Sequence, residues 1–163
     1  MNKPGMSTHQ STKMKNDEWL TPREILAPLG HFDLDPCSPH PDKRPWATAD
    51  KHYHELGLMR EWHGRVWLNP PYGTESIHWL KRLADHNNGI ALIFAKTETV
   101  NFFSQIWDRA DAILFIKGRL TFCYVDGTPA ANNGGAPSCL VAYGENNVKT
   151  LAECNIPGKY IRL

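Results

Sequence analysis

Apolar runs separated by amphipathic segments are the feature that most constrains the fold of this chain. Residues 89–95 (GIALIFA) and 111–117 (DAILFIK) are almost continuously apolar, which is typical of strands buried on both faces of a sheet. Residues 74–86 and 99–110 instead carry apolar side chains at helical spacing. Because strands that alternate with helices favour right-handed crossovers, the pattern predicts an α/β domain with a mainly parallel sheet and helices on both faces.

Three further segments are predicted to complete this sheet. Residues 65–69 (RVWLN) precede the first helical segment, whereas 120–125 (LTFCYV) and 138–144 (SCLVAYG) follow the last predicted buried strand. Between these two closing strands lie residues 126–137 (DGTPAANNGGAP), which are too polar and glycine-rich to pack and are longer than a usual hairpin loop. Ligands of such sheets bind beyond the carboxyl ends of the strands, so a site is expected there.

The beginning of the chain is less regular. A short helix is expected to begin after Thr21, with Pro22 at its first position and Glu24 completing a capping box. Residues 31–35 (HFDLD) fit a short strand, and the prolines that follow exclude a regular helix. Residues 46–64 are rich in aromatic and histidine side chains and receive no assignment.

The composition limits the partners only loosely. The formal net charge of +1 gives no strong field toward nucleic acid or membranes, so a DNA partner would have to meet a local basic patch. The four cysteines form no C-x-x-C pair and the eight histidines match no ligand spacing, so no metal is expected. Residues 1–15 are polar and are expected to be a disordered arm before a single domain over 16–163. With no apolar span long enough for a bilayer, we expect a cytoplasmic protein without a membrane partner.

The least ordinary stretch follows the strand predicted over 65–69. It consists of Asn69, Pro70, Pro71 and Tyr72, and it separates that strand from a predicted helix. A plain turn would need neither both prolines nor the flanking amide and aromatic ring. The alternative interpretation is a strand-ending turn in which the side chain of Tyr72 simply packs against its neighbours.

These four residues suit the chemistry of an aromatic amino group such as that of adenine, whose lone pair is delocalised into the ring. Two acceptors on its two hydrogens would draw the nitrogen toward tetrahedral geometry and free the lone pair. The side-chain oxygen of Asn69 can be one acceptor and a backbone carbonyl, such as that of Pro70, the other. The prolines fix the turn, and Tyr72 can stack on a base taken out of its duplex. Because asparagine cannot take up a proton, the amino group would be activated by hydrogen bonding alone. It would lose its proton only after a group such as methyl has been transferred to it.

At this point the chain resembles a known family. N-P-P-Y after a hydrophobic strand is the catalytic signature of S-adenosylmethionine-dependent amino methyltransferases. The stretches EWLTPREIL, FDLDPC, GLMREWHGRVWLNPPY and GRLTF together are similar to the small phage-type DNA N-6-adenine methyltransferases, over roughly residues 18–143. The resemblance implies a Rossmann-like fold, S-adenosylmethionine as cofactor, and double-stranded DNA whose target adenine is flipped out. It also implies a phage or prophage origin and a role in restriction-modification or anti-restriction.

The resemblance further implies a cofactor site. The pair Thr21-Pro22 resembles the segment that contacts the methionine end of the cofactor, and Asp35 resembles the acidic strand-end residue beside it. The candidate cofactor-binding residues are Trp19, Thr21, Pro22, Asp33, Asp35, Pro36, Cys37 and, as a ribose ligand, Asp50. Plainer interpretations stay open for some of them: Thr21 as a helix cap, Asp33 as a solvated strand residue, and Asp35 as the start of an Asx-turn.

The chain also departs from the wider class. Asp35 is followed by Pro36-Cys37-Ser38-Pro39 without the usual glycine-rich loop, and the short distance to Asn69 predicts an abbreviated first half of the sheet.

Alternative functions are methylation of RNA adenine or of a protein glutamine, or a catalytically silent DNA-binding module. Within 126–137, the amides of Asn132 and Asn133 are candidates for reading a base edge.

Overall fold

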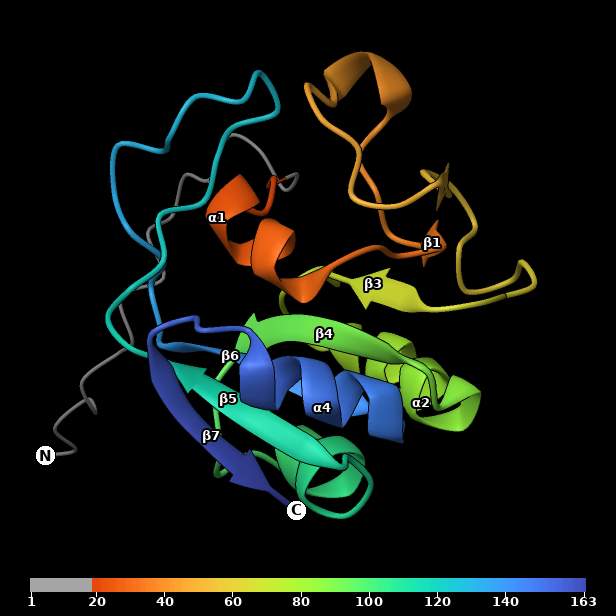
Figure 1. The fold of residues 1–163 in the computed structure, drawn as a ribbon. Helices are drawn as coiled ribbons and strands as arrows, with labels where there is room; N and C mark the ends of the chain where they lie inside the picture. The colour runs from red at the N-terminus through yellow and green to blue at the C-terminus, as the bar shows by residue number, and fades with distance from the viewer. Residues whose placement is uncertain (1–18) are drawn as a thin grey trace, which may run out of the picture.

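The computed structural model describes residues 19–163 (Figure 1). The arm predicted over residues 1–15 lies outside the described residues. The helices are α1 (Arg23–Leu26), α2 (Ser76–His86), α3 (Val100–Phe102) and α4 (Glu145–Glu153). The strands are β1 (Leu34–Asp35), β2 (Lys51–His52), β3 (Val66–Leu68), β4 (Gly89–Phe94), β5 (Ala112–Ile116), β6 (Ser138–Tyr143) and β7 (Gly158–Arg162). Within the described residues, no helix is both long enough and apolar enough to cross a membrane.

The strands form one seven-stranded sheet in the order β2-β1-β3-β4-β6-β5-β7. The strands β2, β1, β3 and β4 run parallel to one another, but β6 is antiparallel to both β4 and β5, and β7 is antiparallel to β5. The prediction of a mainly parallel sheet is therefore wrong for the second half. The chain leaves β5 at its carboxyl end and stays at that edge until β6 begins, so β6 has to run in the opposite direction.

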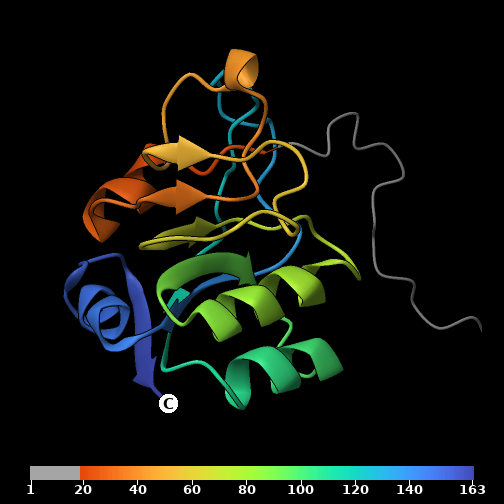
Figure 2. The same ribbon diagram turned by 90° about the vertical axis from the view of Figure 1, so that its right-hand side faces the viewer.

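Helices cover both faces of the sheet, as predicted (Figure 2). One face packs against α2, α3 and the helical turn Phe103–Trp107 after α3, through side chains that include Leu80, Leu83, Phe102 and Ile106. The other face packs against α1, the 3-10 turn Ala27–Leu29 after α1, and α4, through side chains that include Ile25, Leu29, Val148 and Leu151.

One prediction for the C-terminal half needs correction, and two elements there were not predicted. Residues 120–125 form no strand of the sheet and make only isolated bridges, from Cys123 to Leu20 and to Pro129. The helix α4 and the strand β7 were not predicted from the sequence. The side chain of Arg65, just before β3, anchors α4, since its Nε donates a hydrogen bond of 2.6 Å to Oδ1 of Asn147.

The first half of the sheet is abbreviated, as expected. The strands β1 and β2 have two residues each, and a 3-10 turn at Pro41–Lys43 is the helical element between them. The helix α1 begins after Pro22 without a side-chain cap, so the capping role predicted for Thr21 is wrong. Its side chain has another contact, described below.

Candidate functional site

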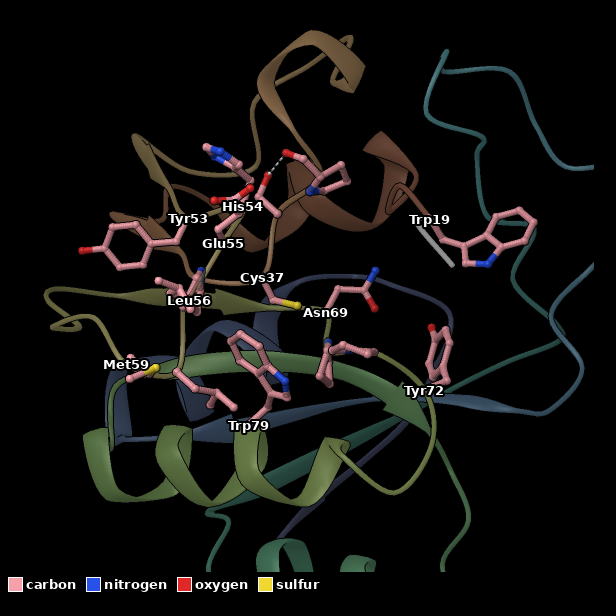
Figure 3. A pocket seen from close by; sticks show the side chains of 17 residues that line it. Trp19, Cys37, Tyr53, His54, Glu55, Leu56, Met59, Asn69, Tyr72 and Trp79 are labelled. Carbon is pink, nitrogen blue, oxygen red and sulfur yellow. Dashed lines mark hydrogen bonds between the residues drawn. The ribbon is translucent and has the colours of Figure 1, made fainter. Parts of the chain in front are cut away.

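A cavity of about 490 Å³ lies at the carboxyl ends of β1, β2 and β3 (Figure 3). Its size is in the usual range for a small-molecule site. Residues 36–39 after β1, 53–59 after β2 and 69–72 after β3 form its wall, together with Trp19 and Trp79. Because β1 and β3 are parallel neighbours, Pro36-Cys37 and the N-P-P-Y segment meet in one cavity. This is the juxtaposition that the sequence predicts.

Asn69 occupies the centre of the cavity wall (Figure 3). Its amide nitrogen donates a hydrogen bond of 3.3 Å to the hydroxyl of Thr21, which is 2% exposed. Its side-chain oxygen Oδ1 is buried and has no hydrogen-bond partner within the described part of the chain. A buried acceptor without a donor costs about 1–3 kcal/mol, so the site is built to receive a donor at this oxygen.

Tyr72 presents its ring at the rim of the cavity. It stacks on Phe94 with ring centroids 4.2 Å apart and an interplanar angle of 12°, and it meets the edge of Phe122 at 6.1 Å. The residue remains 37% exposed, so one face of the ring stays available, whereas burial around the hydroxyl raises the pKa of the phenol. The role of Phe94 was not predicted. Its position at the carboxyl end of β4, the strand next to β3, could have indicated that Phe94 lies beside Tyr72.

Asp35 lies behind the cavity wall and does not line it. The side chain is 3% exposed, and its carboxylate accepts hydrogen bonds from the backbone nitrogen of Cys37 (3.1 Å) and from the hydroxyl of Thr48. Burial raises the pKa of this carboxyl to about 6, against the opposing effects of both hydrogen bonds and of the positive charge of Arg44. The Asx-turn interpretation is thus observed, and it shapes the Pro36-Cys37 segment of the wall.

His52 fixes the loop that brings Thr48 to Asp35, a role that the sequence did not suggest. Its Nε2 accepts hydrogen bonds from the backbone nitrogens of Thr48 (3.2 Å) and Ala49 (3.3 Å). An acceptor nitrogen requires a neutral ring. Burial, and then the charge of Arg44, lower the pKa of His52 to about 4, which keeps the ring neutral.

Two predicted cofactor residues lie away from the cavity. Asp33 accepts a hydrogen bond of 2.6 Å from the backbone nitrogen of Arg65, and Asp50 pairs with His31 at 2.9 Å. Both precede their strands, at the edge opposite the cavity. Neither side chain lines the cavity in which the cofactor was expected to bind. The ligand atoms of His31, Asp33 and Asp50 lie within 4.8 Å of one another, and the ring of His31 lies 3.9 Å from the carboxylate of Asp33 and 2.9 Å from that of Asp50.

The remaining predicted residues divide between wall and support. Trp19, Pro36, Cys37, Pro70 and Pro71 line the cavity. Thr21 supports Asn69 from behind, as described above, and the buried Pro22 follows it at the start of α1. Burial, and then the neighbouring charge of Asp35, raise the pKa of Cys37 to about 12, so its thiol stays protonated.

The segment after β2, which the sequence left unassigned, contributes further residues. Glu55 is the one carboxylate among the described residues that line the cavity. Gly57 packs so tightly against the Pro36 carbonyl that a Cβ would overlap it, and its own carbonyl accepts a hydrogen bond of 2.8 Å from Trp62 Nε1. Glycine is therefore required where the walls after β1 and β2 meet.

These features define a ligand site at the carboxyl edge of a mixed α/β sheet, an architecture consistent with a Rossmann-like methyltransferase. The family model described as DNA N-6-adenine-methyltransferase (Dam) matches residues 8–155, and the chain belongs to this family. The phage-type resemblance seen in the sequence is thereby confirmed.

A curated relative supports the same grouping. The chain is 32% identical over 128 residues to the DNA N-6-adenine-methyltransferase of Escherichia phage T1, and the alignment covers 72% of this chain. It covers 52% of the phage protein, so the chain spans about half the length of this relative. No solved structure matches the chain.

Proposed function

We propose that this protein transfers a methyl group from S-adenosylmethionine to the exocyclic amino nitrogen of adenine in DNA. The observation that carries the proposal is the side-chain oxygen of Asn69, which is buried in the cavity and lacks a donor within residues 19–163. The amino group of adenine offers such a donor. The Dam family match supports the same substrate.

Asn69 and Pro70 act on the target amino group. Oδ1 of Asn69 accepts one of its hydrogens, and the backbone carbonyl of Pro70, which accepts no hydrogen bond from the described residues, accepts the other. When bound, the cofactor would supply a methyl group on a positively charged sulfur, and this sulfur would keep the electron pair of the carbon–sulfur bond when the methyl group is transferred to the amino nitrogen. Asn69 cannot accept the proton that the nitrogen then loses, so the proton leaves to another acceptor after methyl transfer.

The residues around the cavity fit the proposed cofactor. Glu55 follows β2 and can accept hydrogen bonds from the two hydroxyls of a ribose, the role first expected of Asp50. Leu56 and Leu58 offer apolar surface to an aromatic base. The buried carboxylate of Asp35 places negative charge behind the wall, where it favours the cationic methionine end of the cofactor.

Variants of Tyr72 test base stacking. Tyr72→Phe keeps the ring on Phe94 and is expected to bind DNA within a few-fold of the parent protein. Tyr72→Ala removes the ring, and stacking of one base contributes about 1–3 kcal/mol, so about 5- to 150-fold weaker DNA binding is expected. Titration of fluorescent DNA measures both. Equal binding by Tyr72→Ala would exclude the stacking role.

Asp35→Asn is expected to increase stability and weaken cofactor binding at the same time. The folded pKa of Asp35, about 6, lies above the ordinary value of 3.8, so between these two pH values the folded protein retains a proton that the unfolded chain has lost. The stabilisation from this proton is complete below pH 3.8 and is lost as the pH rises through about 6. The amide introduced by Asp35→Asn does not ionise, so the variant does not lose this stabilisation. The loss in the parent protein is roughly 3 kcal/mol of unfolding free energy at most.

Urea denaturation at pH 4 and pH 7 measures the stability of this variant, and calorimetric titration at pH 8 measures its affinity for S-adenosylmethionine. The exposed Asp108→Asn serves as the matched control and should change neither quantity. Unchanged cofactor affinity of Asp35→Asn would leave Asp35 with only its turn-forming role.

The proposed function is tested by incubating the protein with radiolabelled S-adenosylmethionine and, in separate reactions, duplex DNA, RNA and a protein mixture. Label on N6 of adenine in DNA is the expected result. Label on RNA or on protein glutamine would replace the proposed substrate, and cofactor binding without any transfer would replace the proposed enzyme with a binding module.

A further inference from the structure

We propose that residues 126–137 read the sequence of the DNA duplex beside the target adenine, through the side-chain amides of Asn132 and Asn133. This inference rests on the proposed function, because it names the element that selects the substrate for the same site. Nothing in the chemistry of methyl transfer assigns a role to this segment.

The segment belongs to a long excursion at the edge of the sheet that holds the cavity. Residues 117–137 connect β5 to β6 without forming a helix or a strand of the sheet, and such long connections in compact domains are usually functional. In Figure 1 they rise beyond the sheet on the same side as α1. Cys123 pairs with Leu20 through backbone hydrogen bonds of 2.9 and 3.1 Å, one residue away from Thr21 and Trp19. The excursion is therefore attached directly beside the cavity.

One end of residues 126–137 packs on the rings that hold Tyr72. A Cβ placed on Gly134 would lie 3.5 Å from Cε1 of Phe94 and 3.4 Å from Cε2 of Phe122, so this glycine lies close to both rings. The nitrogen of Gly134 also donates a hydrogen bond of 2.7 Å to the carbonyl of Leu120. Asn133 is thus the immediate neighbour of a residue that lies close to Phe94 and Phe122, the two rings against which Tyr72 packs.

The other end of the segment is fixed as well. Gly127 lies against Pro45 and Trp46, since a Cβ at this glycine would approach their side chains to 2.9 and 3.0 Å. The nitrogen of Ala130 donates a hydrogen bond of 2.8 Å to the carbonyl of Phe122. A loop whose two ends are already held in place loses less conformational entropy when it binds DNA, which suits a segment that recognises DNA sequence.

The middle of the segment offers unused hydrogen-bonding groups. Asn132 and Asn133 are both exposed, and their side-chain amides form no hydrogen bond within residues 19–163. An asparagine amide can pair with N6 and N7 of adenine in the major groove through two hydrogen bonds. Lys117, exposed at the start of the excursion, adds positive charge suited to phosphate contact.

The test uses the double variant Asn132→Ala/Asn133→Ala and a random-sequence duplex library. The parent protein, the double variant and the matched control Asn146→Ala methylate the library, and the modified adenines are mapped with their flanking sequences. Asn146 is exposed on α4, which starts at the opposite edge of the sheet. We expect the double variant to lose about 5- to 150-fold of preference at one or more flanking base pairs. Its affinity for S-adenosylmethionine should equal that of the parent.

The outcomes separate this inference from the proposed function. If the parent methylates adenine with flanking preferences and the double variant shows the same preferences, residues 126–137 do not read DNA and the proposed function stands. The same conclusion follows if the parent has no flanking preference. If the parent transfers no methyl group to DNA, the proposed function fails and this inference fails with it.

Discussion

The Asn69→Ala variant is expected to lose about a hundredfold or more of its methyl-transfer rate while its affinity for S-adenosylmethionine stays near that of the parent. Removal of one positioned polar group from an active site typically reduces the rate by this amount. The variant removes the buried oxygen proposed to accept a hydrogen from the target amino group, whereas the main chain that lines the cavity is unchanged. Single-turnover assays with labelled cofactor measure the rate, and calorimetry measures the affinity.

Asn101→Ala is the matched control for this variant. Asn101 also has a buried side-chain oxygen without a partner in the described chain, and its amide also donates to a hydroxyl, that of Ser76 at 3.0 Å. It lies in α3, outside the cavity. Asn101→Ala should therefore transfer methyl groups at the parental rate. Near-normal turnover by Asn69→Ala, or an equal loss in both variants, would contradict the role proposed for Asn69.

Gly57→Ala is expected to lower the free energy of unfolding by about 3 kcal/mol and to abolish measurable cofactor binding. The added methyl group would overlap the carbonyl oxygen of Pro36 and approach Cη2 of Trp79 to 3.0 Å. The backbone on each side is held in place, by Asp35 before Pro36 and by the hydrogen bond from Trp62 to Gly57. Relief of the overlap would separate the cavity walls after β1 and β2.

Urea denaturation and calorimetric titration of S-adenosylmethionine measure the two effects. Gly135→Ala is the control, because a Cβ at that glycine meets no atom within 4 Å and its φ lies outside the left-handed region. It should match the parent in stability and in cofactor affinity. A Gly57→Ala protein with parental values of both would show that the close approach of the two walls is not required.

The sequence by itself determined the local parts of the site. The Asn69-Pro70-Pro71-Tyr72 turn, the strand before it and the helix after it all follow from short-range properties: proline geometry, β-propensity and helical spacing. The meeting of this turn with Pro36-Cys37 was also predictable, because the carboxyl ends of parallel strands share one edge. The family was predictable for the same reason, since its signature lies in short contiguous stretches.

Only the tertiary structure decided the direction of β6. A strand buried on both faces has the same apolar composition whichever way it runs, so the sequence could not distinguish a parallel from an antiparallel pairing. The path of residues 117–137 along one edge of the sheet made that choice. Residues 120–125 look like a strand but find their partner in Leu20, which is distant in sequence.

The tertiary structure also decided which acidic and aromatic residues reach the cavity. Asp33 and Asp50 lie at the amino ends of β1 and β2, whereas Glu55 follows the carboxyl end of β2, a distinction that depends on where a two-residue strand begins. The stacking of Phe94 on Tyr72 depends on the pairing of β3 with β4. Such contacts depend on the register between strands that are far apart in sequence, and this register could not be predicted from local sequence patterns.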